Sequence, residues 1–262
     1  MARIHPTALV DPKAELAADA EVGPYCVVGP KVKIGDGTVL DAHVVVGGRT
    51  TIGRGNRFFP FSAIGGAPQD KKYAGEDTEL VIGDGNTVRE HCTFSLGTAQ
   101  GGGATRVGSD NWIMASVHVA HDCVVGDHTI LANNVTLAGH VTLDDWVIIG
   151  GLSGVHQFCR VGAHAMVGGA SAVLRDIPPY VICNGNPCAP HGINTEGLKR
   201  RGFDADTINQ LRRAYKLVYR DGKTVAEAVA ALDALIAEAP ASAPALALLR
   251  DFVRDSPRGI IR

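Results

Sequence analysis

The 262-residue sequence predicts a mainly β fold, a parallel β-helix of about ten coils, followed by a small α-helical domain. Two observations predict it: apolar side chains recur at every sixth position, and a helical pattern replaces this period near residue 190. A period of six fits neither an α-helix nor a simple strand, but is typical of coils in which each hexad forms one flat side. We therefore expect a β-helix over residues 1–190 and a helical domain over residues 191–262.

The apolar positions fall into two registers. The first consists of Ile4, Val10, Leu16, Val22, Val28, Ile34, Leu40, Val46, Ile52, Phe58 and Ile64, and it resumes at Ile82, Val88 and Phe94. The second, offset by one residue, consists of Val107, Ile113, Val119, Val125, Leu131, Leu137, Leu143, Ile149, Val155, Val161, Val167 and Val173. Three hexads make one coil, so residues about 18 positions apart should stack in columns, with neighbouring coils ~4.8 Å apart.

Glycine often directly follows the apolar position, as at Gly23, Gly29, Gly35, Gly47, Gly53 and Gly65. Because glycine adopts positive φ angles without steric cost, we expect these residues in corner turns with positive φ.

Two segments interrupt the hexads. The stretch between Ile64 and Ile82 is polar and contains proline and glycine, which predicts a loop extruded from a coil. The Gly-rich segment from Thr98 to Thr105 predicts a second, flexible loop. Insertions on regular solenoids commonly carry binding residues, so both loops are candidates for a ligand site.

Beyond Pro190 the sequence predicts three helices. The first is capped by Asp204 or Asp206 and ends near residues 221–222, the second opens with the capping-box pair Thr224 and Glu227 and ends before Pro240, and the third runs from Ser242 to Asp255. Residues 199–262 hold 12 Lys and Arg against 8 Asp and Glu, so this domain is the basic end of the chain. Two interpretations remain open: a solvated cap, or a docking surface for an acidic partner or phosphate groups.

The composition argues against several classes of protein. A net charge of −2 gives no support for nucleic-acid binding. No apolar run reaches the ~18 residues of a membrane span, and the first residues do not resemble a secretion signal, so we expect a cytoplasmic protein without membrane insertion. The six cysteines are scattered without a CxxC pair, and we expect free, reduced thiols.

The segment from Val117 to Cys123 is the richest in chemistry, because it contains His118, His121 and Asp122. Histidine is the usual general base near neutral pH, and an adjacent carboxylate orients the ring or stabilises its cation. Adding 18 residues to His121 gives Gly139, and adding 18 more gives Gln157.

The column is flanked by His140 and His156, so histidines from three adjacent coils should converge. The amide of Gly139, with no side chain in the way, is a candidate oxyanion donor for acyl transfer. No Ser or Cys nucleophile is needed, because the base can activate a substrate hydroxyl directly. Zinc is the alternative, with His118, His121 and His140 as three ligands.

Several longer motifs then identify a resemblance. They are HPTAxV at 5–10, PQDKKYAGE at 68–76, GTAQGGG at 97–103, HVAHDC at 118–123, LANNxTLAGHV at 131–141, HQFC at 156–159, GAHAMVGG at 162–169, DIPPY at 176–180 and GINTEGLKRRGF at 192–203. With these motifs, which run from end to end, the chain resembles the UDP-N-acetylglucosamine O-acyltransferase family, whose members begin lipid A synthesis. The hexads alone are shared by many acyltransferases, whereas HVAHDC, HQFC and EGLKRRGF together are specific.

The resemblance implies a left-handed β-helix and a homotrimer with active sites between neighbouring subunits. It implies transfer of a 3-hydroxyacyl group from acyl carrier protein to the 3-hydroxyl of UDP-N-acetylglucosamine, with no metal or redox cofactor. His121 is then the general base, Asp122 its partner, and Gly139 the oxyanion donor. The remaining residues that the resemblance places in the site are His118, His140, His156 and Gln157 as lining residues, Gln69, Asp70 and Lys72 for the sugar nucleotide, and Asn194, Glu196, Arg200 and Arg201 for the nucleotide or the carrier arm.

Three positions bear on specificity. Ser95 and Leu96 stand where the family often has His and Arg, which leaves a phosphate contact there in doubt. Gly169 occupies the position that limits acyl-chain length in the family, and its lack of a side chain predicts a longer acyl group.

Alternatives to this function remain at this stage. The N-acyltransferase of the same pathway is expected to carry an extra N-terminal uridine-binding domain, whereas the hexads here begin at Ile4. An enzyme that acylates a 3-amino sugar nucleotide, a zinc-dependent hydratase on the same fold and a non-catalytic scaffold are the others.

Overall fold

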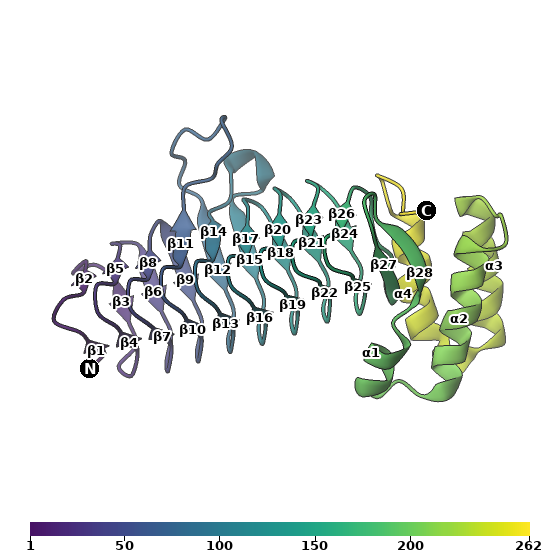
Figure 1. Cartoon of the computed structure of the whole chain (residues 1–262), viewed down its shortest axis with the longest axis horizontal. Helices are drawn as coiled ribbons and strands as arrows, with labels where there is room; N and C mark the ends of the chain where they lie inside the picture. Colours follow the sequence, from purple (N-terminus) through teal and green to yellow (C-terminus); the bar gives the residue numbers. More distant parts are fainter.

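A computed structural model describes residues 1–262 and confirms the predicted fold class, a left-handed parallel β-helix followed by a small helical domain. Figure 1 shows the coils stacked along the long axis, with the N-terminus at one end and the helices at the other. Three sheets form the sides of the prism.

The first sheet has eleven strands. In order they are β1 (Arg3–Ile4), β4 (Glu21–Val22), β7 (Val39–Leu40), β10 (Arg57–Phe58), β13 (Thr87–Val88), β16 (Trp112–Ile113), β19 (Ile130–Leu131), β22 (Ile148–Ile149), β25 (Met166–Val167), β27 (Val181–Asn184) and β28 (Ala189–Ile193). All neighbours are parallel except β27 and β28, which form an antiparallel hairpin.

The second sheet has nine strands and the third has eight. The second contains β2 (Leu9–Val10), β5 (Val27–Val28), β8 (Val45–Val46), β11 (Ala63–Gly66), β14 (Thr93–Ser95), β17 (His118–Val119), β20 (Thr136–Leu137), β23 (Gly154–Val155) and β26 (Ala172–Val173). The third contains β3 (Glu15–Leu16), β6 (Val32–Ile34), β9 (Arg49–Ile52), β12 (Glu79–Ile82), β15 (Ala104–Val107), β18 (Val124–Val125), β21 (Thr142–Leu143) and β24 (Arg160–Val161). The chain therefore passes three corners in each coil: a first corner from the first to the second sheet, a second from the second to the third, and a third corner back to the first sheet.

The register between coils is the one that the hexads predict. His118 pairs with Thr136 and Val119 with Leu137, a step of 18 residues. The hexad side chains point inward and form one continuous core, in which Phe58, Ile113 and Leu137 are fully buried. Ile4 is an exception, 45% exposed, because the first coil has no neighbour below it to cover its apolar side chain.

The positive φ expected for the corner glycines is confirmed at Gly65, whose φ is 74°, and is wrong at the other five. Gly35 and Gly53 do not have positive φ; they are needed because a Cβ would come within 2.6 Å of a carbonyl oxygen of the next coil. At most corners the residue with positive φ lies three positions after the hexad residue. Many of these residues are not glycine, as at Tyr25, His43 and Asn134.

Both predicted loops are present, and both leave the second corner, which we call the loop corner (Figure 1). The longer loop, residues 67–78, connects β11 to β12. The shorter connects β14 to β15 and contains a 3₁₀ turn, η1 (Ala99–Gly101). Asp77 fixes the base of the longer loop through ion pairs with Lys31 and Arg49, and the Lys31 ammonium lowers the pKa of this carboxyl group.

The helical domain contains α1 (Thr195–Arg200), α2 (Ala205–Tyr219), α3 (Val225–Glu238), η2 (Pro240–Ser242) and α4 (Ala243–Arg254). The three predicted helices are confirmed as α2, α3 and α4, with Asp204 as the cap of α2 and the Thr224–Glu227 capping box at α3. Helix α1 and the hairpin β27–β28 were not predicted, and the boundary placed at residue 190 falls within β28. None of these helices has the length and apolar character to span a membrane alone; the sharply bent pair Val225–Glu238 and Pro240–Arg254 meets that test only when taken together.

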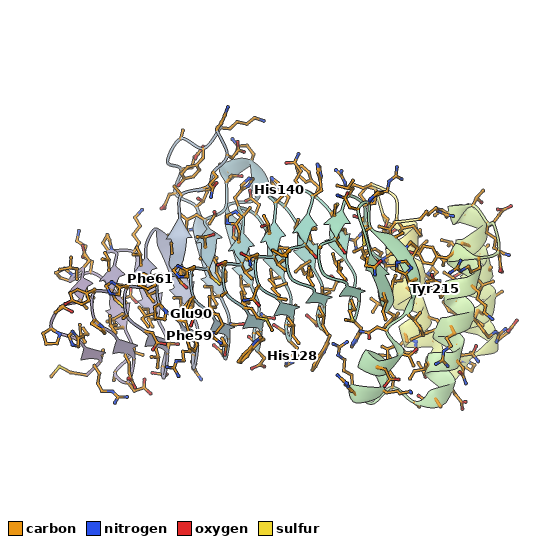
Figure 2. All side chains as sticks on the ribbon, in the orientation of Figure 1. Phe59, Phe61, Glu90, His128, His140 and Tyr215 are labelled. Atoms are coloured by element: carbon orange, nitrogen blue, oxygen red, sulfur yellow. The ribbon has the colours of Figure 1, made fainter.

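Aromatic rings stack along the other two corners. Tyr25, His43, Phe61 and His91 form a stack on the first corner, and His128, Trp146, His164 and Tyr180 form one on the third. Figure 2 shows His128 on the edge of the prism opposite to His140 and the loops. In the second stack, burial and then the adjacent Arg201 guanidinium lower the pKa of His164 to about 4.

We predict that His164 makes the fold less stable in mild acid. Its pKa in the unfolded chain is about 6.5, so protonation favours the unfolded state as the pH falls from about 6.5 towards 4. His164→Gln removes this contribution, and its free energy of unfolding should fall less between pH 7 and pH 5 than that of the wild type. Urea denaturation at both pH values measures the difference. His5→Gln, at an exposed position in the first coil, should keep the wild-type pH dependence, and equal slopes for all three proteins would contradict the prediction.

Candidate active site

The loop corner brings the predicted catalytic column together. The backbone N–H of His140 donates to the carbonyl of His121 (3.0 Å), and that of Phe158 donates to the carbonyl of Gly139 (3.1 Å). An ideal Cβ on Gly139 would lie 2.5 Å from Cε1 and 2.7 Å from Nε2 of His121. The imidazole therefore lies against the backbone of Gly139, as the 18-residue count predicts.

His121 is oriented by its neighbour. Its Nδ1 lies 2.8 Å from Oδ2 of Asp122, whose side chain is fully buried. With the Nδ1 proton donated to this carboxylate, Nε2 carries the free lone pair, and it is one of the two ring atoms that lie nearest to Gly139. The Gly139 N–H has no hydrogen-bond partner within the chain and is free to donate to an oxyanion next to His121.

The shorter loop holds Asp122 in place. Thr98 donates to it twice, from its backbone N–H to Oδ1 (2.8 Å) and from its hydroxyl to Oδ2 (2.6 Å). Gly101 packs so closely on this carboxylate that a Cβ there would overlap it. Thr105 accepts a hydrogen bond from the Asp122 backbone N–H (2.8 Å). Asp122 itself has a φ of 60°, a strained conformation for a non-glycine residue that these contacts stabilise.

Two further histidines flank the pair. His140 packs edge-on against His121, with its Nε2 3.7 Å from Oδ2 of Asp122, and stacks on Phe158 at a centroid distance of 4.4 Å. The Nδ1 of His118 forms a hydrogen bond of 2.7 Å with the Thr93 hydroxyl. Burial, followed by the charge of His121, lowers the pKa of His118 and favours its neutral form.

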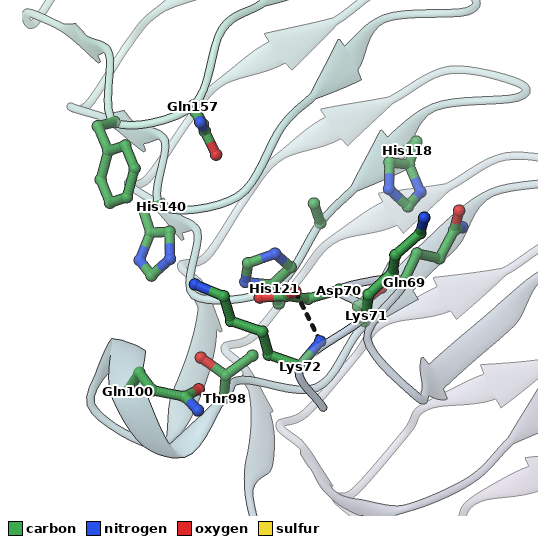
Figure 3. Close-up of a pocket in the computed structure, with 13 residues that line it drawn as sticks. Gln69, Asp70, Lys71, Lys72, Thr98, Gln100, His118, His121, His140 and Gln157 are labelled. Atoms are coloured by element: carbon green, nitrogen blue, oxygen red, sulfur yellow. Dashed lines mark hydrogen bonds between the residues drawn. The ribbon is translucent and has the colours of Figure 1, made fainter. Parts of the chain in front are cut away.

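A cavity of about 710 Å³ opens over these residues, between the loop corner and the longer loop (Figure 3). Its lining includes the predicted residues Gln69, Asp70, Lys72, His118, His121, His140 and Gln157. The backbone N–H of Lys72 donates to Oδ1 of Asp70 (3.0 Å), which forms a tight turn at the tip of the loop. The cavity also contains residues that the sequence analysis did not single out: Lys71, Thr98, Gln100, Ala120 and Phe158. Thr98 and Gln100 belong to the Gly-rich loop. The sequence marked this loop as a candidate ligand site, and that was the only signal that pointed to these two residues.

Ser95 and Leu96 differ in their placement. Ser95 lines the cavity, whereas Leu96 is buried in the core beside Gly48. Leu96, which stands where the family often has arginine, therefore packs in the core. Of these two residues only Ser95 can contact a ligand in the cavity.

The other predicted site residues lie elsewhere on the chain. Asn194 is buried, caps α1, and donates to the carbonyl of His164 on the third corner. Arg201 contacts the ring of Trp146 and Nδ1 of His164 on the same corner. Glu196 and Arg200 are on α1, and Glu196 pairs with Lys199. Within one chain none of these four residues reaches the cavity.

Gly169 lies on the first corner, where a Cβ would meet the carbonyl oxygen of Gly151 at 3.2 Å. His156 is on the loop corner, but its ring lies outside the cavity lining, with Nδ1 3.4 Å from the guanidinium of Arg258. The predicted residues therefore occupy all three corners of the prism.

His121, Asp122 and His140 are the residues that could hold a metal ion, because one atom from each lies within 4.8 Å of the others. This set differs from the three histidines named as ligands in the alternative zinc interpretation of the sequence, since Asp122 replaces His118. Both oxygens of Asp122 already accept hydrogen bonds from Thr98, which a metal at Oδ2 would have to displace.

Comparisons with known proteins agree along the whole chain. A model described as UDP N-acetylglucosamine O-acyltransferase, domain 2, matches residues 176–261, and a bacterial transferase hexapeptide model matches residues 104–139. The acyl-[acyl-carrier-protein]–UDP-N-acetylglucosamine O-acyltransferases of Thiobacillus denitrificans and of a Janthinobacterium species are 63% and 61% identical to the chain, each over 100% of both sequences.

Solved structures give the same result. The UDP-N-acetylglucosamine O-acyltransferase of Moraxella catarrhalis superposes with a TM-score of 0.95 at 50% identity, covering 99% of each chain. The Arabidopsis UDP-N-acetylglucosamine acyltransferase superposes with a TM-score of 0.86 at 34% identity, covering 99% of this chain and 100% of that one.

Proposed function

The chain belongs to the family of acyl-[acyl-carrier-protein]–UDP-N-acetylglucosamine O-acyltransferases, and from this premise we propose how its site performs the reaction. It is an acyltransferase for the first step of lipid A biosynthesis. The observation that carries the mechanism is the position of the His121 imidazole, oriented by Asp122 and directly against Gly139.

In the proposed reaction, Nε2 of His121 removes the proton from the 3-hydroxyl of UDP-N-acetylglucosamine. The hydroxyl oxygen attacks the carbonyl carbon of the acyl thioester, and the N–H of Gly139 stabilises the resulting oxyanion. Collapse of the tetrahedral intermediate breaks the carbon–sulfur bond, and the proton on His121 goes to the departing thiolate. Asp122 stabilises the imidazolium between these two transfers, because its charge is buried and held by Thr98.

The longer loop supplies the groups for the acceptor. Lys72 and Lys71 bring positive charge to the cavity, which suits the diphosphate of a sugar nucleotide. Asp70 and Gln69 offer hydrogen-bond acceptors and donors for sugar hydroxyls. We propose that the acceptor lies between this loop and His121, and that the reaction needs no metal or redox cofactor, since the base is already activated by a carboxylate.

The test is an assay of the purified protein with UDP-N-acetylglucosamine and a series of 3-hydroxyacyl carrier proteins, in buffer containing EDTA. Mass spectrometry should show a singly acylated sugar nucleotide, and mild alkali should release the acyl group, as it does from an ester but not from an amide. His121→Ala should lower kcat about 10³-fold, since a general base contributes roughly 10²–10⁴. Gly139→Ala should lower it by about 10², because its Cβ displaces the imidazole.

His5→Ala is the matched control and should keep the wild-type rate. Wild-type turnover by His121→Ala would exclude His121 as the base, a base-stable product would indicate a 3-amino acceptor, and loss of activity in EDTA would indicate a metal.

We further propose that the chain works as a homotrimer of parallel prisms. The support is the distribution of the site: His121 is on the loop corner, whereas Gly169 and Arg201 are on the two other corners, so that only a neighbouring subunit can bring them to the cavity. The stack on the first corner offers a contact surface, since Tyr25 and Phe61 are more than half exposed. Equilibrium sedimentation should give three times the chain mass of 27.4 kDa, and a fully active monomer would contradict this arrangement.

We propose a cytoplasmic location, supported by six cysteines that are all free and buried. The basic helical domain suits an acidic acyl carrier protein, the proposed partner and co-substrate.

Gly169 gives a prediction about acyl-chain length. Its open position, exposed on the first corner, should leave room for a longer acyl group, and Gly169→Met should shorten the preferred donor. The backbone of Gly169 does not have positive φ, so methionine is tolerated with a small shift away from Gly151. The measurement is kcat/KM across the series of donors. Gly169→Ala is the control for backbone effects, and an unchanged donor preference in Gly169→Met would contradict the assignment.

A further inference from the structure

The loop corner continues beyond the cavity towards the C-terminal end of the prism. The column that contains His121, Gly139 and Gln157 reaches Arg175 after one more step of 18 residues. At this level the chain's last residues replace the next coil: the backbone N–H of Asp176 donates to the carbonyl of Gly259 (3.2 Å), and that of Ile261 donates to the carbonyl of Asp176 (2.9 Å). Figure 1 shows this C-terminal segment on the same ridge of the molecule as the two loops.

This arrangement brings two arginines to one place. The guanidinium of Arg258 lies 3.4 Å from Nδ1 of His156, and a Cβ on Gly259 would lie 3.4 Å from Nη1 of Arg175. Neither arginine forms an ion pair with a carboxylate, although many other arginines of the chain do. Two positive groups therefore converge on the ridge without an ion pair, although the carboxylate of Asp176 is close enough to Arg258 for the two charges to interact.

Beside them lies a second cavity, of about 490 Å³. It is lined by Leu174, Arg175, Pro187, Cys188 and residues 260–262. Its surface combines apolar side chains with guanidinium groups, which suits a ligand that carries both a branched hydrocarbon and an anionic group.

The distance between His121 and the two arginines fits one ligand of this kind. Arg175 is three coils from His121, or about 14 Å along the corner, and His156 with Arg258 lies about one coil closer. A phosphopantetheine arm measured from its sulfur to its phosphorus is about as long as four extended residues, roughly 14 Å. With the thioester at His121, an arm laid along the corner would place its phosphate at the arginines and its dimethyl group on the apolar lining.

Resting on the proposed function, we propose that Arg175 and Arg258 bind the phosphodiester of the carrier's pantetheine arm. The acceptor loop occupies the N-terminal side of His121, so the donor enters along the C-terminal side, over His156 and Gln157. This site is separate from the residues on α1 and the third corner that the family resemblance associates with the nucleotide or the carrier arm.

The experiment compares two small donors, a 3-hydroxyacyl pantetheine and the same compound with its 4′-phosphate. The wild type should prefer the phosphorylated donor in kcat/KM by about a hundredfold, and Arg175→Ala or Arg258→Ala should reduce this ratio about tenfold each, as expected for charge-assisted hydrogen bonds. Arg175→Lys should keep most of the preference. Arg54→Ala, which removes an exposed arginine near the other end of the prism, is the matched control and should leave the ratio unchanged.

The outcomes separate this inference from the proposed function. Transfer by the wild type with equal use of both donors, or a preference that survives in both alanine variants, would overturn the phosphate site and leave the acyl transfer standing. No transfer from these donors or from an acyl carrier protein would overturn the acyl transfer, and the phosphate site with it. Thermal unfolding of each variant shows whether the C-terminal segment still packs, and a lowered ratio counts only for variants that unfold at the wild-type temperature.

Discussion

The hydrogen bonds between successive coils are the constraint on which the rest of the structure depends. Each coil is bonded to the next at fixed register, so in coils without an inserted loop a residue and the one 18 positions later lie about 5 Å apart. Short strands of two residues would not be stable alone, and they persist because stacking buries one continuous apolar core. The same register turns sequence spacing into spatial position, so His121 meets Gly139 without any other element having to bring them together.

The two loops act on this rigid corner in different ways. The shorter loop stabilises the proposed base: Thr98 and Gly101 enclose Asp122, whose carboxylate orients the ring of His121. The longer loop stands away from the prism and carries its polar side chains over the cavity. In the proposed mechanism, the solenoid and the shorter loop set the catalytic geometry, and the longer loop binds the acceptor. A division of this kind keeps the base in place while the substrate enters and leaves.

The regular register between coils also made much of the structure predictable from the sequence. The coils, the corner column and three of the four α-helices were predictable, because apolar periodicity and capping pairs are local signals. Thr98 was not recognised as the residue that holds Asp122, since the loop inserts it outside the hexad count. Helix α1 has only six residues and no apolar periodicity of its own, so its capping by Asn194 was not visible. Five of the six glycines after the hexad positions lack the expected positive φ. At Gly35 and Gly53 the next coil comes too close for a side chain, which could not be predicted because it depends on atoms of another coil, whereas φ is a local property.

In the proposed mechanism, the two substrates approach His121 from opposite directions along the prism. From His121, one end of the loop corner leads to the lysines of the longer loop, and the other leads past Gln157 to the C-terminal segment. A sugar nucleotide and an acyl thioester each carry a charged group far from the reacting atoms, and binding energy from such remote groups can hold the reacting atoms in place. In the proposed mechanism, a straight ridge with positive charge at both ends and His121 between them would align two long substrates so that they meet only at this residue. Because the coils cannot slide past one another, the distance from His121 to each charged end is set by the number of coils between them, and this number would match the lengths of the two substrates.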